Sequence, residues 1–230
     1  MVTAKPPLWV WVLLVAAIFG VSSAGTLLQQ IDLDPLLKAS WRLQLTAVVL
    51  LPFAIVQWRQ QPSEVKAQMF EKRTLAILAL SGLALALHFG AWVASLKYTT
   101  LTHSLLFVTA HPLIVVAGMF ILGILLTGVR QPTQRELVGA IIGFAGAALT
   151  LLDEGTQQGD NTVTLLGDSL ALLGAFTVVG YIVCGRILRA WMPIFLYAFP
   201  VTLLAAVLLL PASMLIESDF ATYGVVGWLD

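Results

Sequence analysis

The sequence is poor in charged residues. Lysine, arginine, aspartate and glutamate make up 10% of its 230 residues, whereas a soluble domain carries about a quarter. Hydrophobic residues make up 59% of the chain, and the mean hydropathy is +0.94. This composition predicts a protein that crosses a lipid bilayer several times.

The sequence also lacks the chemistry on which several other function classes depend. Its twelve basic residues balance twelve acidic ones and form no long basic run, so a nucleic-acid backbone would meet no matching charge. Neither a GxSxG turn nor an HExxH motif occurs, and the three histidines belong to no cluster with metal-ligand spacing. The single cysteine, Cys184, can form no disulfide within the chain. We therefore expect no enzyme, no metal site, no cofactor and no nucleic-acid partner.

What the sequence has instead is a series of long apolar runs. Seven of them approach the roughly 17 to 25 residues that a helix needs to cross a hydrocarbon core. They are Leu8 to Leu28, Trp41 to Trp58, Leu75 to Leu96, Ser104 to Leu126, Leu137 to Leu152, Leu165 to Cys184 and Ile194 to Ile216. The sequence thus predicts an all-α polytopic membrane protein with seven transmembrane helices.

The distribution of charge predicts the orientation of these spans. With the N-terminus in the cytoplasm, nine of the twelve lysine and arginine residues face the cytoplasm, as membrane proteins prefer. The first run could instead end in a signal-peptidase site, since Ser22 and Ala24 occupy its small-residue positions. Apolar character continues through Leu27 and Leu28, which favours a retained span. Cleavage would leave the orientation of the later spans unchanged.

Two short matches indicate an internal repeat. TAVVLLP at 46–52 matches AAVLLLP at 205–211 with an offset of 159, and Gly20 matches Gly180 with an offset of 160. Five spans separate each element from its copy, so the second unit would be inverted in the membrane. We expect a first five-helix unit in residues 1–153 and a partial second unit, of two helices, in residues 154–230.

The same offset predicts copies of spans three to five beyond the end of this sequence, at about 235 to 312. We therefore expect the chain to be a fragment of a protein of roughly 310 to 330 residues with ten spans. Such a fragment would lack three helices on one side of its cavity and would not transport by itself.

Several segments resemble the EamA family of the drug/metabolite transporter superfamily. They are PLLKASWRLQLTAVVLLP, LHFGAWVASLKYTTLTHSLLFVTAHPLIVV, ELVGAIIGFAGAALTLLD and GDSLALLGAFTVVGYIVCGRILR. The resemblance implies ten helices in two inverted units of five, both termini in the cytoplasm, and movement of small metabolites through a central cavity. The sequence departs from the family at GVR, where Val129 replaces a common glutamate, and in having no counterpart of helices eight to ten.

Polar side chains on the third span share one helical face. Ser81, His88, Trp92 and Ser95 fall at positions i, i+7, i+11 and i+14, so we expect them to face the interior of the bundle. An ionisable residue such as His88 usually marks a functional site when it lies inside a membrane. The alternative is that these residues only form hydrogen bonds between helices, each worth about 0.6 to 2 kcal/mol.

The fourth span carries a second polar stripe. Ser104, His111 and Gly118 repeat the heptad spacing, and Pro112 follows the histidine directly. Because proline has no N–H, it should free the carbonyl of Val108 and bend the helix beside His111.

These observations define a predicted solute site, in which the two histidines would hydrogen-bond a polar substrate. The candidate binding residues are His88, Trp92, Ser95, His111, Tyr181 and Gln29. His103, at the membrane boundary, is expected to be an interface residue. A stripe of Gly139, Gly143 and Gly146 is expected to let helices pack closely within the bundle.

No aspartate or glutamate lies deep in any predicted span, which favours a neutral or zwitterionic solute such as an amino acid. The expected function is therefore transport of small metabolites through the bilayer by alternating access. The alternative is a non-transporting membrane protein or inactive fragment with a structural or receptor-like role. The predicted cytoplasmic N-terminus argues against a seven-helix receptor. The sequence leaves open whether the chain forms a homo-oligomer.

Overall fold

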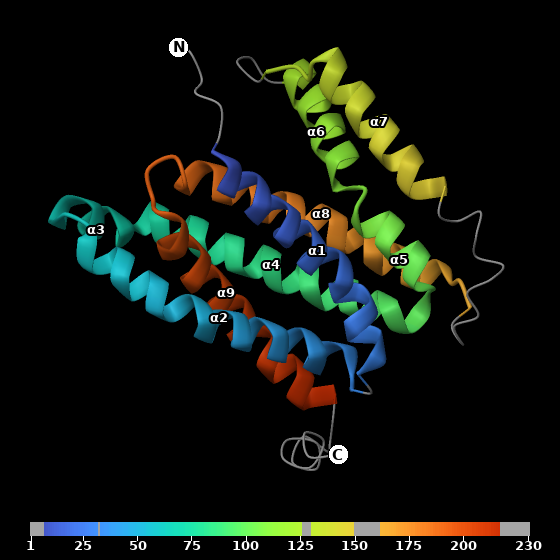
Figure 1. Ribbon diagram of the computed structural model, residues 1–230, viewed down its shortest axis with the longest axis horizontal. Helices are drawn as coiled ribbons and strands as arrows, with labels where there is room; N and C mark the ends of the chain where they lie inside the picture. Colours follow the sequence, from blue (N-terminus) through green and yellow to red (C-terminus); the bar gives the residue numbers. More distant parts are fainter. Residues whose placement is uncertain (1–6, 32, 126–129, 150–161, 217–230) are drawn as a thin grey trace. The chain divides into compact units, whose positions relative to one another are not determined.

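The computed structural model describes residues 7–31, 33–125, 130–149 and 162–216, and all regular elements in these ranges are helices (Figure 1). The predicted all-α fold is confirmed. The helices are α1 (Leu8–Gln30), α2 (Pro35–Gln60), α3 (Ser63–Met69), α4 (Lys72–Tyr98), α5 (Leu101–Val108), α6 (His111–Leu125), α7 (Gln134–Ala148), α8 (Leu165–Leu188) and α9 (Ile194–Ile216). Contacts divide the chain into two compact units, residues 1–32 with α1 and residues 33–230 with the other helices.

Within the described ranges, six helical segments are long and apolar enough to cross a membrane. They are Leu8–Leu28, Pro35–Gln60, Lys72–Tyr98, Leu101–Leu125, Leu165–Leu188 and Ile194–Pro211. The seventh predicted span, Leu137 to Leu152, overlaps α7, of which 15 helical residues are described. Residues 150–152 lie outside the described part, so this seventh crossing stays a prediction.

Large apolar side chains lie on the outer surfaces of the helices. Val48 on α2 is 68% exposed, Ile142 on α7 is 66% exposed, and Phe176 on α8 is 55% exposed. Water penalises such surface by about 25 cal/mol per Å², whereas lipid acyl chains accept it. The chain is therefore an integral membrane protein, as its composition predicts.

Helix α4 lies between α8 on one side and α2 and α9 on the other (Figure 1). Helices α4 and α8 run antiparallel, since Gly167 at the start of α8 lies against Tyr98 at the end of α4 and Gly174 lies against His88. A Cβ atom on Gly167 would come within 2.6 Å of the Tyr98 backbone. The missing side chain at this position thus permits the close approach and fixes the register of the two helices.

Helix α9 packs along α2, and the two helices carry the two copies of the repeated motif. The rings of Phe53 and Phe195 stack with their centroids 5.0 Å apart. The side-chain Oε1 of Gln57 accepts a hydrogen bond from the backbone N–H of Phe195 at 2.9 Å. This bond satisfies one of the donors that the first turn of α9 cannot pair internally.

The predicted fourth span, Ser104 to Leu126, is not one bent helix. It is divided into α5 and α6, and the break lies at Thr109 and Ala110. Pro112 is the second residue of α6, where a helical N–H has no internal acceptor and its absence costs little. The irregularity expected beside His111 is present, and it takes the form of a break between two helices because Pro112 lies in the first turn of α6. The freed carbonyl of Val108 accepts a hydrogen bond from Nδ1 of His111 at 3.3 Å.

Candidate functional site

The polar stripe of α4 faces the interior of the bundle, as predicted. Ser81 and Ser95 are fully buried, and Trp92 is 6% exposed. His88 is half-buried. Each of these side chains contacts a different part of the bundle, so the stripe forms a line of polar contacts along the central helix.

His88 is held in one tautomer by α8. Its Nδ1 lies 2.8 Å from the carbonyl oxygen of Gly174, and because a carbonyl can only accept, Nδ1 carries the hydrogen. In the neutral ring Nε2 is then an acceptor. The ring stacks on Trp92, with centroids 6.2 Å apart and planes 16° from parallel. This contact fixes the orientation of both rings.

Arg42 of α2 completes this cluster, and the sequence prediction did not include it. Its guanidinium carbon lies 4.8 Å from the ring centroid of Phe89 and 5.5 Å from that of Trp92. Nη1 of Arg42 and Nε1 of Trp92 are both buried, and neither has a hydrogen-bond partner among the residues that the structure describes. We name Arg42, His88, Phe89 and Trp92 the Arg42 cluster. In the sequence Arg42 is a cation within an apolar run, and there it contributes only to the predicted orientation of the spans.

The hydroxyl groups of Ser81 and Ser95 form hydrogen bonds with other residues of the bundle. The Ser95 hydroxyl donates to the carbonyl of Trp92 at 2.6 Å, so Ser104, also at 2.6 Å, donates to Ser95. Tyr197 donates to the carbonyl of Tyr181 at 3.2 Å, which leaves Ser81 as donor to the Tyr197 hydroxyl at 2.6 Å. These contacts match the alternative of hydrogen bonds between helices, and Ser95 gains no visible access to a solute.

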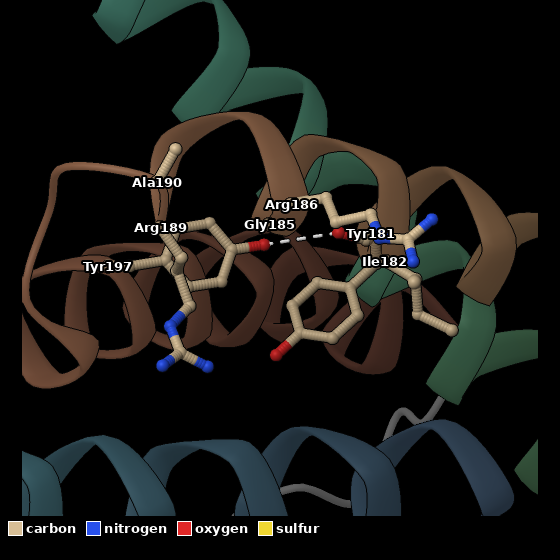
Figure 2. Close-up of a pocket in the computed structure, with 7 residues that line it drawn as sticks. All are labelled: Tyr181, Ile182, Gly185, Arg186, Arg189, Ala190 and Tyr197. Atoms are coloured by element: carbon tan, nitrogen blue, oxygen red, sulfur yellow. Dashed lines mark hydrogen bonds between the residues drawn. The ribbon is translucent and has the colours of Figure 1, made fainter. Parts of the chain in front are cut away.

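Tyr181 lies in a different place from the Arg42 cluster. It is seven residues beyond Gly174, which is about 10 Å along α8. There it lines an open pocket of about 450 Å³ whose other lining residues are Ile182, Gly185, Arg186, Arg189, Ala190 and Tyr197. Figure 2 shows the rings of Tyr181 and Tyr197 beside the Arg189 side chain. Gly174, rather than Tyr181, is the α8 residue that contacts His88.

His103, which the sequence places at the membrane boundary, bridges two helices. Its Nδ1 lies 3.2 Å from Oδ2 of Asp168, the acidic residue in the first turn of α8. The hydroxyl of Thr99 donates to Oδ1 of the same carboxylate at 2.7 Å. Thr164 adds a further hydrogen bond from its hydroxyl to the carbonyl of Tyr98. This polar cluster joins the α4–α5 turn to the start of α8.

The remaining predicted residues are not brought into the Arg42 cluster. His111 is half-buried at the start of α6, and the described contacts include no hydrogen bond or ring contact between it and His88, although the two imidazoles are close enough to interact electrostatically. Gln29 lies in α1, in the unit that is described by itself. Both assignments stay predictions.

The glycine stripe of α7 is open in the structure. Cβ atoms added to Gly139, Gly143 and Gly146 would meet nothing within 4 Å. Among the described residues, no other helix packs closely against these glycines. Their role in helix packing therefore stays a prediction.

The site has no set of metal ligands, since the described residues contain no group of three or more histidine, cysteine, aspartate or glutamate side chains placed to hold an ion.

Comparison with known proteins gives one result: the EamA-like transporter family matches residues 7–152. No curated protein and no solved structure matches the chain.

Proposed function

Because the chain belongs to the EamA-like transporter family, we propose that, as part of the full-length protein, it moves a small zwitterionic solute, such as an amino acid, across the membrane by alternating access. The observation that carries this proposal is the orientation of His88 in the interior of the bundle. Its Nδ1 is occupied by Gly174, so its acceptor nitrogen Nε2 is left for another donor. An ammonium group is a donor of the required kind.

The aromatic neighbours of His88 support the same proposal. Trp92 and Phe89 supply apolar ring faces next to the polar nitrogen. Binding sites for small solutes commonly combine such apolar walls with a few convergent polar groups. His111, whose Nδ1 donates to Val108, would offer a second acceptor from α6.

The break between α5 and α6 is the proposed hinge for alternating access. Helix α5 is tied to the central helix by the Ser95–Ser104 hydrogen bond. Helix α6 packs on α7, and both α5 and α6 contact α8. Rotation about Thr109 and Ala110 would move α6 while α5 stays in place, and interrupted helices of this kind occur where transporters bind their substrates.

The proposed orientation has the N-terminus in the cytoplasm, as the distribution of lysine and arginine predicts. The contact between His103 and Asp168 then lies toward the outside, and the pocket lined by Tyr181 lies toward the cytoplasm, because Asp168 and Tyr181 lie toward opposite ends of α8.

Flux measurements on the purified full-length protein in proteoliposomes test the proposal. A panel of labelled amino acids is offered, and uptake is compared between the wild type, His88→Ala and the matched control Leu87→Ala, a neighbour that is 49% exposed on the outside of α4. We expect uptake of at least one zwitterion, a loss with His88→Ala, and no change with Leu87→Ala. Saturable binding without flux would favour the receptor-like alternative, and neither binding nor flux would favour a structural role.

A further inference from the structure

We propose that Arg42 and Trp92 form a subsite for the carboxylate group of the transported solute. The assignment deepens the proposed transport function and rests on it. It starts from two buried hydrogen-bond donors that have no acceptor in the described part of the chain, Nη1 of Arg42 and Nε1 of Trp92. Buried donors are normally paired, and an unpaired one in a native structure calls for a ligand or another acceptor.

The aromatic rings around Arg42 do not supply that acceptor. Contacts with Phe89 and Trp92 at 4.8 and 5.5 Å place the guanidinium within cation–π distance of both rings. Ring faces attract the positive charge, but they do not give Nη1 an oxygen acceptor. Both donors also belong to side chains in direct contact with each other, so one ligand group could satisfy them together.

A carboxylate matches these donors in charge and shape. Within the described part of the chain, no aspartate or glutamate lies within ion-pair distance of Arg42, whereas the exposed Arg130 pairs with Glu136 at 2.7 Å. The planar guanidinium presents parallel N–H groups that bind two carboxylate oxygens at once. An uncompensated cation is costly inside a membrane, so an incoming anion would be favoured there.

The position of the subsite suits a zwitterion. Arg42 lies seven residues into α2, about 10 Å along the helix from Pro35. His88, which stacks on Trp92, offers the acceptor Nε2. Anion-binding donors at Arg42 and Trp92 and an acceptor at His88 correspond to the two charged ends of an amino acid.

The Trp92 indole provides a direct test that does not require transport. The protein with ¹⁵N-labelled tryptophan is placed in lipid nanodiscs, and the indole N–H signals of its seven tryptophans are recorded. Trp92→Phe identifies the Trp92 signal. The probes are acetate, the smallest suitable carboxylate, and acetamide, its neutral analogue. We expect a saturable shift of the Trp92 signal with acetate and not with acetamide. The signal of Trp58 should not shift, because Trp58 lies against Phe70 near the end of α2, away from Arg42.

Substitution of Arg42 gives the second arm of the test. Arg42→Gln should weaken acetate binding roughly tenfold or more, since a charge-assisted hydrogen bond is lost. Arg42→Lys keeps the charge but not the planar fork, so an intermediate affinity is expected. If Arg42→Gln fails to fold, the acetate and acetamide titrations of Arg42→Lys and the wild type still decide the question. Equal shifts with both probes, no shift with acetate, or unchanged affinity in the arginine variants would overturn the proposal.

A lipid phosphate is the other source of anionic oxygens, and the nanodisc composition separates the two. In phosphatidylcholine discs and in discs with added phosphatidylglycerol, a solute carboxylate site should give the same acetate affinity. A Trp92 signal that follows phosphatidylglycerol and ignores acetate would assign the donors to lipid and overturn the proposal. Failure of the transport proposal can be distinguished from failure of the subsite proposal. Amino-acid flux that Arg42→Gln does not change contradicts only the subsite. Acetate binding without any amino-acid flux contradicts only the transport function.

Discussion

Nδ1 of His103 lies 3.2 Å from Oδ2 of Asp168, and this bridge joins α5 to the first turn of α8 across 65 residues of sequence. The carboxylate also accepts the hydroxyl of Thr99, which is fully buried. The two oxygens of one side chain thus hold two neighbouring elements against α8.

This arrangement predicts a graded effect of substitutions at Asp168. Asp168→Asn keeps a side-chain oxygen that can accept from Thr99 but removes the negative charge of the carboxylate. Asp168→Ala leaves the buried hydroxyl of Thr99 without its acceptor. We expect Asp168→Ala to lower the free energy of unfolding by about 1 to 3 kcal/mol and Asp168→Asn by less. Thermal unfolding in detergent measures both, and equal stabilities for the two variants would contradict the bridge.

The contrast between His88 and Tyr181 shows how much of the site the sequence could predict. Helical periodicity predicted which side of α4 is buried, since side-chain direction depends only on position along one helix. It could not predict which α8 residue faces His88, because the register of two helices depends on where their backbones approach. That register is fixed at Gly167 and Tyr98, and it brings Gly174 rather than Tyr181 to the histidine.

The role of Arg42 and the form of the irregularity in the fourth span could not be predicted from the sequence, for related reasons. A lysine or arginine near a helix end is typical of membrane orientation signals, so the sequence alone gave Arg42 no further role. Its contacts with Phe89 and Trp92 arise only from the packing of α2 against α4. Pro112 correctly marked the irregularity, but its surroundings decide whether a helix bends or restarts.

Close packing at Gly167 predicts a large cost for a small side chain. A Cβ there would meet backbone atoms of Tyr98 at 2.6 Å, and backbone atoms cannot move aside as the end of a flexible side chain can. We expect Gly167→Ala to lower the melting temperature, as overpacking typically costs about 1 to 3 kcal/mol. Gly118→Ala is the matched control, because nothing lies within 4 Å of its Cβ position. Similar melting temperatures for the two variants would show that α4 and α8 are not in this register.

The start of α7 should respond to acid. Arg130 donates to both oxygens of Glu136 at 2.9 and 2.7 Å, and the N–H and hydroxyl of Thr133 also donate to this carboxylate. These bonds lower the pKa of Glu136 from 4.5 to about 2. Because the folded pKa is depressed, the stabilisation is present above pH 4.5 and is lost as the pH falls toward 2.

An NMR titration of the labelled glutamate carboxyl groups checks this assignment. In Arg130→Gln the pKa of Glu136 should rise toward 4.5, and high salt should reduce the difference because both side chains are exposed. An unchanged pKa in this variant would mean that Arg130 does not hold the carboxylate in solution.

Helix polarity predicts a membrane crossing between residues 134 and 163. Asp168 at the start of α8 contacts His103 near the start of α5, so α8 begins on the side where the α5–α6 segment begins. If that segment crosses the membrane, the chain must return before α8. Helix α7 lies in this interval.

Cysteine labelling in a Cys184→Ala background tests the return crossing. With the N-terminus in the cytoplasm, Val163→Cys should react with an impermeant reagent in intact cells, and Gln134→Cys should react only after permeabilisation. Both native side chains are exposed. Labelling of both positions from one side would exclude a crossing by α7.

The role of His88 can be separated from that of a packing residue by the choice of substitution. Asparagine can place its amide N–H near the position of Nδ1 and keep the hydrogen bond to the carbonyl of Gly174, but it has no atom at the position of Nε2. If His88 binds solute through Nε2, both His88→Ala and His88→Asn should lose transport, by roughly tenfold or more for a hydrogen bond to a charged group. If His88 only joins α4 to α8, His88→Asn should transport like the wild type while His88→Ala is less stable.

His111 allows the same comparison on α6, where Nδ1 donates to the carbonyl of Val108. His111→Asn can keep this local bond, so a loss of transport with normal thermal stability would place Nε2 of His111 at the solute. Initial rates are measured in proteoliposomes over a range of solute concentrations. A raised KM with unchanged maximal rate indicates lost solute binding, whereas a lower maximal rate with unchanged KM indicates that the α5–α6 hinge moves less freely. Wild-type kinetics in both asparagine variants would mean that neither histidine contacts the solute through Nε2.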